Sequence, residues 1–204
     1  MAAAPAFGAI LLMGTWPTGV TRDFYAGLAA AKGEGSFVLM DAFSPPGDIL
    51  SILGEGHVDI LKVNAYELCK LSNTGGDDLF EGEVSEDDVS VSCAAIFEQV
   101  PGLRFLALTD GPNPARVVSR GGETTMLTVP TGVKCVNPIG AGDTVAGVMC
   151  AALCSSVAAA TALDHASVAA SMELGIAAAS AKCESEGEGG TFAIERMGGF
   201  LTGL

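Results

Sequence analysis

The feature that most constrains the fold is an alternation of short apolar runs with stretches of helical periodicity. Four runs have the length and composition of buried β-strands, and a turn or a polar residue ends each one: residues 7–13, 36–40, 57–62 and 103–108. The stretches that follow them carry apolar residues at helical spacing. Strands that alternate with helices in this way predict an α/β fold built on a mostly parallel sheet.

The C-terminal half adds a hairpin and further helices to this pattern. Residues 115–118 and 124–129 flank a Gly-Gly turn, which predicts a β-hairpin. Beyond Asn137, apolar residues at helical spacing predict two long helices, and residues 191–200 predict a short final one. No repeat or linker interrupts the chain, so we expect residues 1–204 to form one domain.

Composition limits the kinds of partner. Hydrophobic residues make up 49% of the chain, but Gly, Pro, Asp or Lys interrupts each apolar run before it reaches membrane-spanning length. The formal net charge of -14 argues against binding to nucleic acid, which needs Lys and Arg to neutralise phosphates. We therefore expect neither a membrane nor a nucleic acid as partner. An anionic ligand must be met locally, by helix N-termini, backbone amides and a metal ion.

The cysteines and the N-terminal segment bear on location. The six cysteines form no Cys-x-x-Cys pair and predict reduced thiols rather than a disulfide framework. Residues 1–13 are apolar, but they contain no basic residue and no clean cleavage signal of a secretory peptide. We expect a cytoplasmic protein.

The segment with the most chemical content is 137–143, Asn-Pro-Ile-Gly-Ala-Gly-Asp. Gly140 and Gly142 let the backbone approach a ligand where a helix begins, and the unpaired N–H groups there attract anions. Asp143, in the first turn, has the chemistry to accept a proton from a hydroxyl that attacks a phosphate. The alternative is an ordinary helix start in which Asp143 only complements the helix dipole.

The residues around this segment resemble a known family. Residues 137–149 are similar to the C-terminal signature of the ribokinase/PfkB carbohydrate kinases, and most similar to the tagatose-6-phosphate kinase and 1-phosphofructokinase branch. Three further segments, all earlier in the chain, occur in the same order as in the family. They are 14–19 (Gly-Ser-x-Pro-x-Gly in the family), 62–68 (Lys-Pro-Asn-x-x-Glu-Leu) and 109–111 (Thr-x-Gly). The resemblance implies a ribokinase-like three-layer α/β sandwich.

The resemblance also implies an activity. It indicates a phosphotransferase that uses ATP and Mg²⁺ to phosphorylate a hydroxyl of a small-molecule sugar or sugar phosphate. In this interpretation Asp143 is the catalytic base, and Gly140, Ala141 and Gly142 supply the anion hole for the phosphates.

The other family motifs imply residues for the metal and the nucleotide. Asn64 and Glu67 would organise Mg²⁺ and its waters, while Thr109 and Gly111 would line the nucleotide site. Each pair has a simpler alternative: Asn64 and Glu67 have the spacing of a helix capping box, and Thr109 to Gly111 that of an ordinary turn. For the first pair, both interpretations can hold together.

The resemblance begins at residues 14–19, so roughly the first third of a family chain, with its first strands and substrate lid, has no counterpart. A sheet without those strands exposes an apolar edge, which could favour self-association. The candidates left for a substrate phosphate are four arginines: Arg22, Arg104, Arg116 and Arg120. The alternatives to an active kinase are a catalytically impaired nucleotide-binding remnant and a truncated form of such a kinase.

Overall fold

A computed structural model of the chain describes residues 8–14, 16–73, 84–158, 163–186 and 193–202. The elements follow one another as β1 (Ala9–Met13), α1 (Arg22–Ala30), β2 (Phe37–Asp41), α2 (Pro46–Gly54), β3 (Ile60–Asn64), α3 (Ala65–Ser72), α4 (Glu86–Gln99), β4 (Phe105–Asp110), β5 (Asn113–Ser119), β6 (Thr124–Leu127), α5 (Ala141–Ala158), α6 (His165–Cys183) and α7 (Ile194–Thr202).

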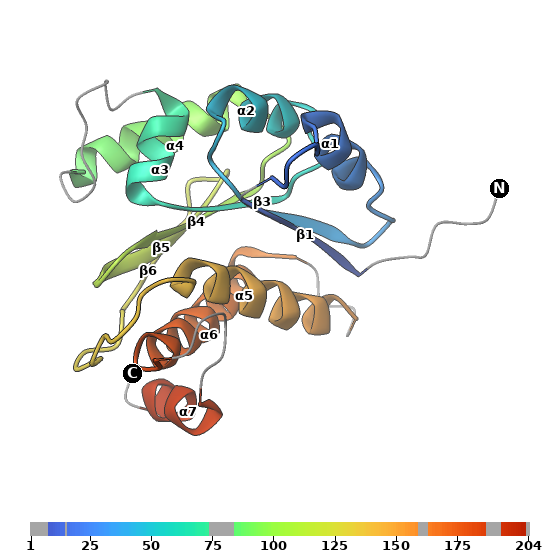
Figure 1. Cartoon of the computed structure of the whole chain (residues 1–204). Coiled ribbons are helices and arrows are strands. Elements are labelled where there is room, and N and C mark those ends of the chain that lie inside the picture. Colours follow the sequence, from blue (N-terminus) through green and yellow to red (C-terminus); the bar gives the residue numbers. More distant parts are fainter. Residues whose placement is uncertain (1–7, 15, 74–83, 159–162, 187–192, 203–204) are drawn as a thin grey trace.

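The strands form a six-stranded sheet in the order β1-β2-β3-β4-β5-β6 (Figure 1). Strands β1 to β4 are parallel, and β5 and β6 continue the sheet as an antiparallel hairpin. This confirms the predicted mostly parallel sheet. Among the described strands β1 pairs only with β2, so one edge of the sheet is open.

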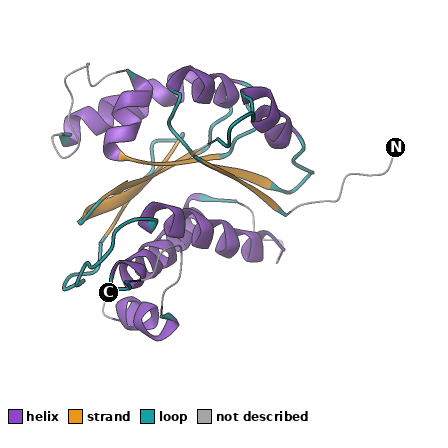
Figure 2. Ribbon diagram, viewed as in Figure 1, coloured by secondary structure: helices purple, strands orange, loops and turns teal. Residues whose placement is uncertain are grey.

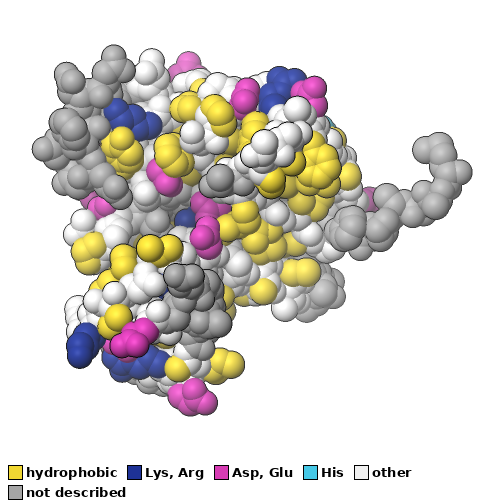
Figure 3. Space-filling model, in the orientation of Figure 1, with side chains coloured by type: hydrophobic (Ala, Val, Ile, Leu, Met, Phe, Trp, Pro, Cys, Tyr) yellow, Lys and Arg dark blue, Asp and Glu magenta, His cyan; other side chains and the backbone are white. Residues whose placement is uncertain are grey.

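Helices cover both faces of the sheet, which gives the predicted three layers (Figure 2). Helices α1 to α4 lie on one face, α5 and α6 lie on the other, and α7 packs on the outside of α6. Hydrophobic side chains gather on the surface where α1 and β1 lie (Figure 3), and Phe24 of α1 is 57% exposed. None of the described helices is both long and apolar enough to cross a membrane.

The alternation of side chains along the strands decides which polar residues face α5. In β3, Leu61 and Val63 belong to the core beneath α1 to α4, whereas Ile60 belongs to the core beneath α5 and α6. Lys62 therefore projects on the α5 side. The β2–β3 register pairs the residue before Asp41 with the residue before Lys62. Asp41 and Lys62 are therefore neighbours across the two strands. A lysine and an aspartate thus meet beneath the start of α5.

The helix starts differ in how their first turn is capped. Ser85 and Asp88 form a capping box at the start of α4, whereas Thr21, at the N-cap of α1, makes no side-chain capping bond. Asp164 and Ser167 form a further capping box at the start of α6. The last predicted helix is α7, and the residues before 193 in its predicted range lie outside the described part.

Candidate active site

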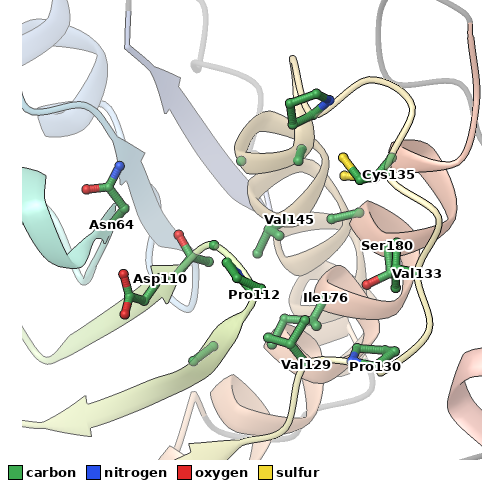
Figure 4. Close-up of a pocket in the computed structure, with 18 of the residues that line it drawn as sticks. Asn64, Asp110, Pro112, Val129, Pro130, Val133, Cys135, Val145, Ile176 and Ser180 are labelled. Atoms are coloured by element: carbon green, nitrogen blue, oxygen red, sulfur yellow. The ribbon is translucent and has the colours of Figure 1, made fainter. Parts of the chain in front are cut away.

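A cavity of about 870 Å³ opens at the carboxyl ends of the parallel strands, beside α5 and α6 (Figure 4). Its lining includes every residue singled out above for the base, the anion hole, the metal and the nucleotide: Asn64, Glu67, Thr109, Gly111, Gly140, Ala141, Gly142 and Asp143. Three of the four sequence motifs therefore converge. The fourth does not, because residues 14 and 16–19 are absent from the lining and Thr15 lies outside the described residues.

Local hydrogen bonds fix the turn that precedes α5. The Asn137 side-chain oxygen accepts the N–H of Ile139 at 3.0 Å, and the carbonyl of Pro138 accepts the N–H of Ala141 at 3.0 Å. Gly140 has a φ of +81°, a conformation that L side chains rarely adopt. The sequence Asn-Pro-Ile-Gly therefore produces a rigid turn with one obligatory glycine.

Some backbone donors remain open where α5 begins. The carbonyl of Gly140 accepts both the N–H of Thr144 at 2.9 Å and its hydroxyl at 2.8 Å. The N–H groups of Gly142 and Asp143 donate to no acceptor among the described residues. The N–H of Ala141 is engaged, whereas those of Gly142 and Asp143 lie open at the positive end of an 18-residue helix.

A buried lysine adds a full positive charge to the turn. The Nζ atom of Lys62 lies 2.9 Å from the position that a Cβ atom on Gly142 would occupy, so a larger residue there would collide with the ammonium group. The same Nζ donates to a carboxylate oxygen of Asp41 at 3.0 Å. The side chain of Lys62 is 5% exposed and that of Asp41 12%. The positive charge is therefore held in place by a fixed ion pair.

Burial raises the pKa of Asp41 from 3.8 to about 6. The charges of Glu67 and Asp143 also raise this pKa, whereas the charge of Lys62 lowers it. The site thus gathers three carboxylates around one ammonium group. Sequence reasoning missed Asp41, and the only signal was its position at the end of a buried strand.

Asn64 and Glu67 form the expected capping box at the start of α3. The N–H of Asn64 donates to Glu67 Oε2 at 2.8 Å, and the N–H of Glu67 donates to Asn64 Oδ1 at 2.7 Å. Because both residues also line the cavity, the capping role does not remove them from the site. Within the described residues, no group of three His, Cys, Asp or Glu side chains could hold a metal ion.

Apolar side chains predominate at the other end of the cavity, where Ser180 also lies. Val129, Val133 and Ile176 line it together with Val145 of α5, opposite Asn64 and Asp110 in Figure 4. The cavity can therefore hold a molecule with one anionic end and one apolar end.

The four arginines considered for a substrate phosphate lie elsewhere, because none lines the cavity and each has a protein partner. The partners are Ser51 for Arg22, the carbonyl of Leu163 for Arg104, Glu86 for Arg116, and the carbonyls of Phe97, Val100 and Leu103 for Arg120.

Solved structures with the same fold include three kinases. Ribokinase from Giardia lamblia is 16% identical, with a TM-score of 0.77 over 96% of this chain and 59% of that chain. Ribokinase from Arabidopsis thaliana complexed with ribose and ATP is 18% identical, with a TM-score of 0.71 over 95% and 55%. Phosphofructokinase-2 from Escherichia coli in complex with substrates and products is 22% identical, with a TM-score of 0.70 over 95% and 57%.

The chain therefore spans less than two thirds of the length of these structures. Because their sequences are only 16–22% identical to it, they establish the fold alone. No curated protein sequence matches it. The model of the pfkB family of carbohydrate kinases matches residues 6–193, which is most of the chain. This match, together with the shared fold, places the chain in the pfkB family of carbohydrate kinases.

Proposed function

We propose that this chain is a single kinase domain that transfers the γ-phosphoryl group of ATP to a hydroxyl of a sugar or sugar phosphate. One observation carries the proposal: the Asp143 carboxylate, the open N–H groups of the helix start and the Lys62 ammonium group meet in one cavity. Phosphoryl transfer needs positioning, stabilisation of negative charge and a base for the attacking hydroxyl. The family supplies the class of acceptor.

The proposed reaction has Asp143 as the general base. As the acceptor oxygen bonds to the γ-phosphorus, Asp143 takes the hydroxyl proton, and the bond from that phosphorus to the β,γ-bridging oxygen breaks to release ADP. The N–H groups of Gly142 and Asp143 and the ammonium group of Lys62 stabilise the charge on the transferring phosphoryl oxygens.

The two ends of the cavity support ATP as the donor. We place the adenine at the apolar end, near Val129 and Ile176, and the phosphates at the turn before α5. Thr109 and Gly111 line the path between them in this placement. Two ribokinases with the same fold were solved with nucleotides, one complexed with ribose and ATP and one in complex with ADP.

The donor set suits Mg²⁺, with Glu67 and Asn64 as the residues that would organise it. Mg²⁺ commonly keeps several waters and uses one or two carboxylates together with substrate phosphates, so the lack of a cluster of three ligands in the described part is compatible with it. When bound, Mg²⁺ would neutralise charge on the phosphates. The capping box holds the Glu67 side chain still for this role.

Nucleotide binding without turnover is the second candidate, and two observations favour it. The chain spans only 55–59% of the length of the three kinases, and the described cavity lining contains one cation, Lys62, which is already paired with Asp41. In this alternative, ATP binds but the acceptor is not held for attack.

An assay of ADP release with Mg²⁺, ATP and a panel of ketoses and ketose phosphates tests the proposal. We expect turnover on one member of the panel, and Asp143→Asn should lower it at least about a hundredfold while leaving ATP affinity within about threefold. Turnover that survives in Asp143→Asn contradicts the assignment of the base. ATP binding without turnover on the whole panel supports the second candidate.

A further inference from the structure

Lys182, the penultimate residue of α6, is completely buried at 0% exposure. Its Nζ donates to the carbonyl oxygen of Asn137 at 2.9 Å. No described carboxylate lies within ion-pair distance of it, although every other buried lysine or arginine side chain in the described part has an acidic partner. A lysine that merely complements the end of a helix belongs in solvent, because burying an unpaired ammonium group costs several kcal/mol.

The position of Lys182 relates it to the phosphate-binding turn. Its Cε atom lies 3.9 Å from the point where a Cβ atom on Gly140 would be, and an Asp143 carboxylate oxygen lies 3.9 Å from the same point. Gly140 and Asp143 line the cavity and Lys182 does not, so the lysine lies behind the turn. Its hydrogen bond is to Asn137, the residue that opens this turn.

Further bonds hold this arrangement together. The N–H groups of Val136 and Asn137 both donate to the carbonyl of Cys183, at 2.7 and 3.0 Å. The end of α6 and the segment that leads into the turn are thus one connected unit. A change in the ammonium group of Lys182 reaches the turn through the Asn137 carbonyl and through its electrostatic field.

We propose that Lys182 is a positioning residue for the phosphate site, where its buried ammonium group orients the turn and places a fixed positive charge behind Gly140. The inference rests on the proposed function and deepens it, because it names a second source of positive potential besides Lys62. Solvent and salt screen a charge inside the protein far less than one on the surface, so it acts on a bound polyphosphate across the turn.

Ligands of different charge distinguish an electrostatic role of Lys182 from a purely space-filling one. A bound triphosphate compensates the buried ammonium group, whereas an uncharged nucleoside does not. If Lys182 acts through its charge, its removal weakens binding of ATP and leaves binding of adenosine nearly unchanged. If Lys182 only fills space, its removal weakens both ligands alike or neither.

Titration calorimetry on Lys182→Met with ATP plus Mg²⁺ and, separately, with adenosine tests this. Lys134→Met is the matched control, because it removes the same charge from an exposed side chain of the neighbouring segment. We expect Lys182→Met to lose about tenfold or more in ATP affinity and to stay within about twofold for adenosine. Lys134→Met should match the wild type for both ligands.

Unchanged ATP affinity in Lys182→Met, or an equal loss for ATP and adenosine, overturns the proposal. If Lys182→Met does not fold by circular dichroism, Lys182→Gln decides in its place, because glutamine keeps a donor for the Asn137 carbonyl and removes the charge. A wild-type protein that binds neither ligand contradicts the proposed function itself and removes this inference with it.

Discussion

Two lysine–aspartate pairs lie at opposite ends of the same parallel strands. Lys32 and Asp59 meet at 2.9 Å just before β3 begins, and Lys62 and Asp41 meet at 3.0 Å where β2 ends. The two aspartate side chains are similarly buried, at 9% and 12% exposure. The two ion pairs are therefore alike in length and in the burial of the aspartate, although Lys32 is more exposed than Lys62.

Their surroundings differ. Asp59 also accepts the N–H of Val38 at 2.9 Å and lies 3.9 Å from Arg104, so several donors surround it. Asp41 lies near two further carboxylates, which help raise its pKa, and its lysine reaches the glycine turn. An ion pair at the amino ends of the strands stabilises the fold, whereas the pair at the carboxyl ends lies where open parallel sheets bind ligands.

The largest expected effect separates the two lysines. Lys62→Met should lower ATP affinity and turnover by about a hundredfold, because it removes a charge at the phosphate turn, whereas Lys32→Met should change either by less than about twofold. Titration calorimetry and the ADP-release assay measure both variants side by side. Equal effects of the two substitutions would break the distinction between the pairs.

Asp59→Asn should lower the stability of the fold rather than the affinity for ATP. It removes the charge that partners Lys32 and the buried N–H of Val38, so the free energy of unfolding should fall by about 2 kcal/mol. Urea denaturation followed by circular dichroism measures this. ATP affinity should remain that of the wild type, and a loss of binding greater than the loss in Lys62→Met contradicts the comparison.

The pH dependence of stability should depend on Asp41. A carboxyl whose pKa is higher in the folded state binds its proton more tightly there, so its contribution is present below about pH 4 and is lost as the pH rises through about 6. Between about pH 4 and pH 7, the free energy of unfolding of the wild type should fall relative to Asp41→Asn by up to about 3 kcal/mol. Urea titrations across this range test it, and a flat difference contradicts the raised pKa of Asp41.

The smallest expected effect concerns the open edge at β1. Self-association through this edge stays a prediction, and Leu11→Lys should shift any concentration-dependent association toward the monomer, because a charge on an edge strand opposes pairing. Light scattering after size-exclusion chromatography, over about a tenfold range of concentration, measures the shift. Association that is unchanged in Leu11→Lys contradicts the role of this edge.

The sequence was sufficient for the strands and for the phosphate turn because both depend on local patterns. Apolar runs bounded by turn residues predicted β1 to β6 to within a few residues. The two glycines and Asp143 were visible because a helix start with an adjacent carboxylate is a short-range pattern. That the Asn64, Thr109 and Asp143 motifs share one cavity followed from the strand ends.

What sequence reasoning missed depends on long-range contacts. Asp41 is an unremarkable strand end until the β2–β3 register brings it to Lys62. Lys182 has the pattern of a helix-terminal charge, and only the packing of Asn137 against α6 buries it. The arginines were unplaced because their partners, such as Glu86 for Arg116, lie far along the chain.

The most direct test of the phosphate site is the affinity for ATP plus Mg²⁺ of Gly142→Val, measured by calorimetry beside the wild type and Asp59→Asn. A side chain at position 142 would collide with the Lys62 ammonium group and occupy the space beside the open N–H groups. We predict that the wild type and Asp59→Asn bind ATP alike and that Gly142→Val loses at least about a hundredfold. Wild-type ATP affinity in a folded Gly142→Val protein would contradict the location of the phosphates at this turn.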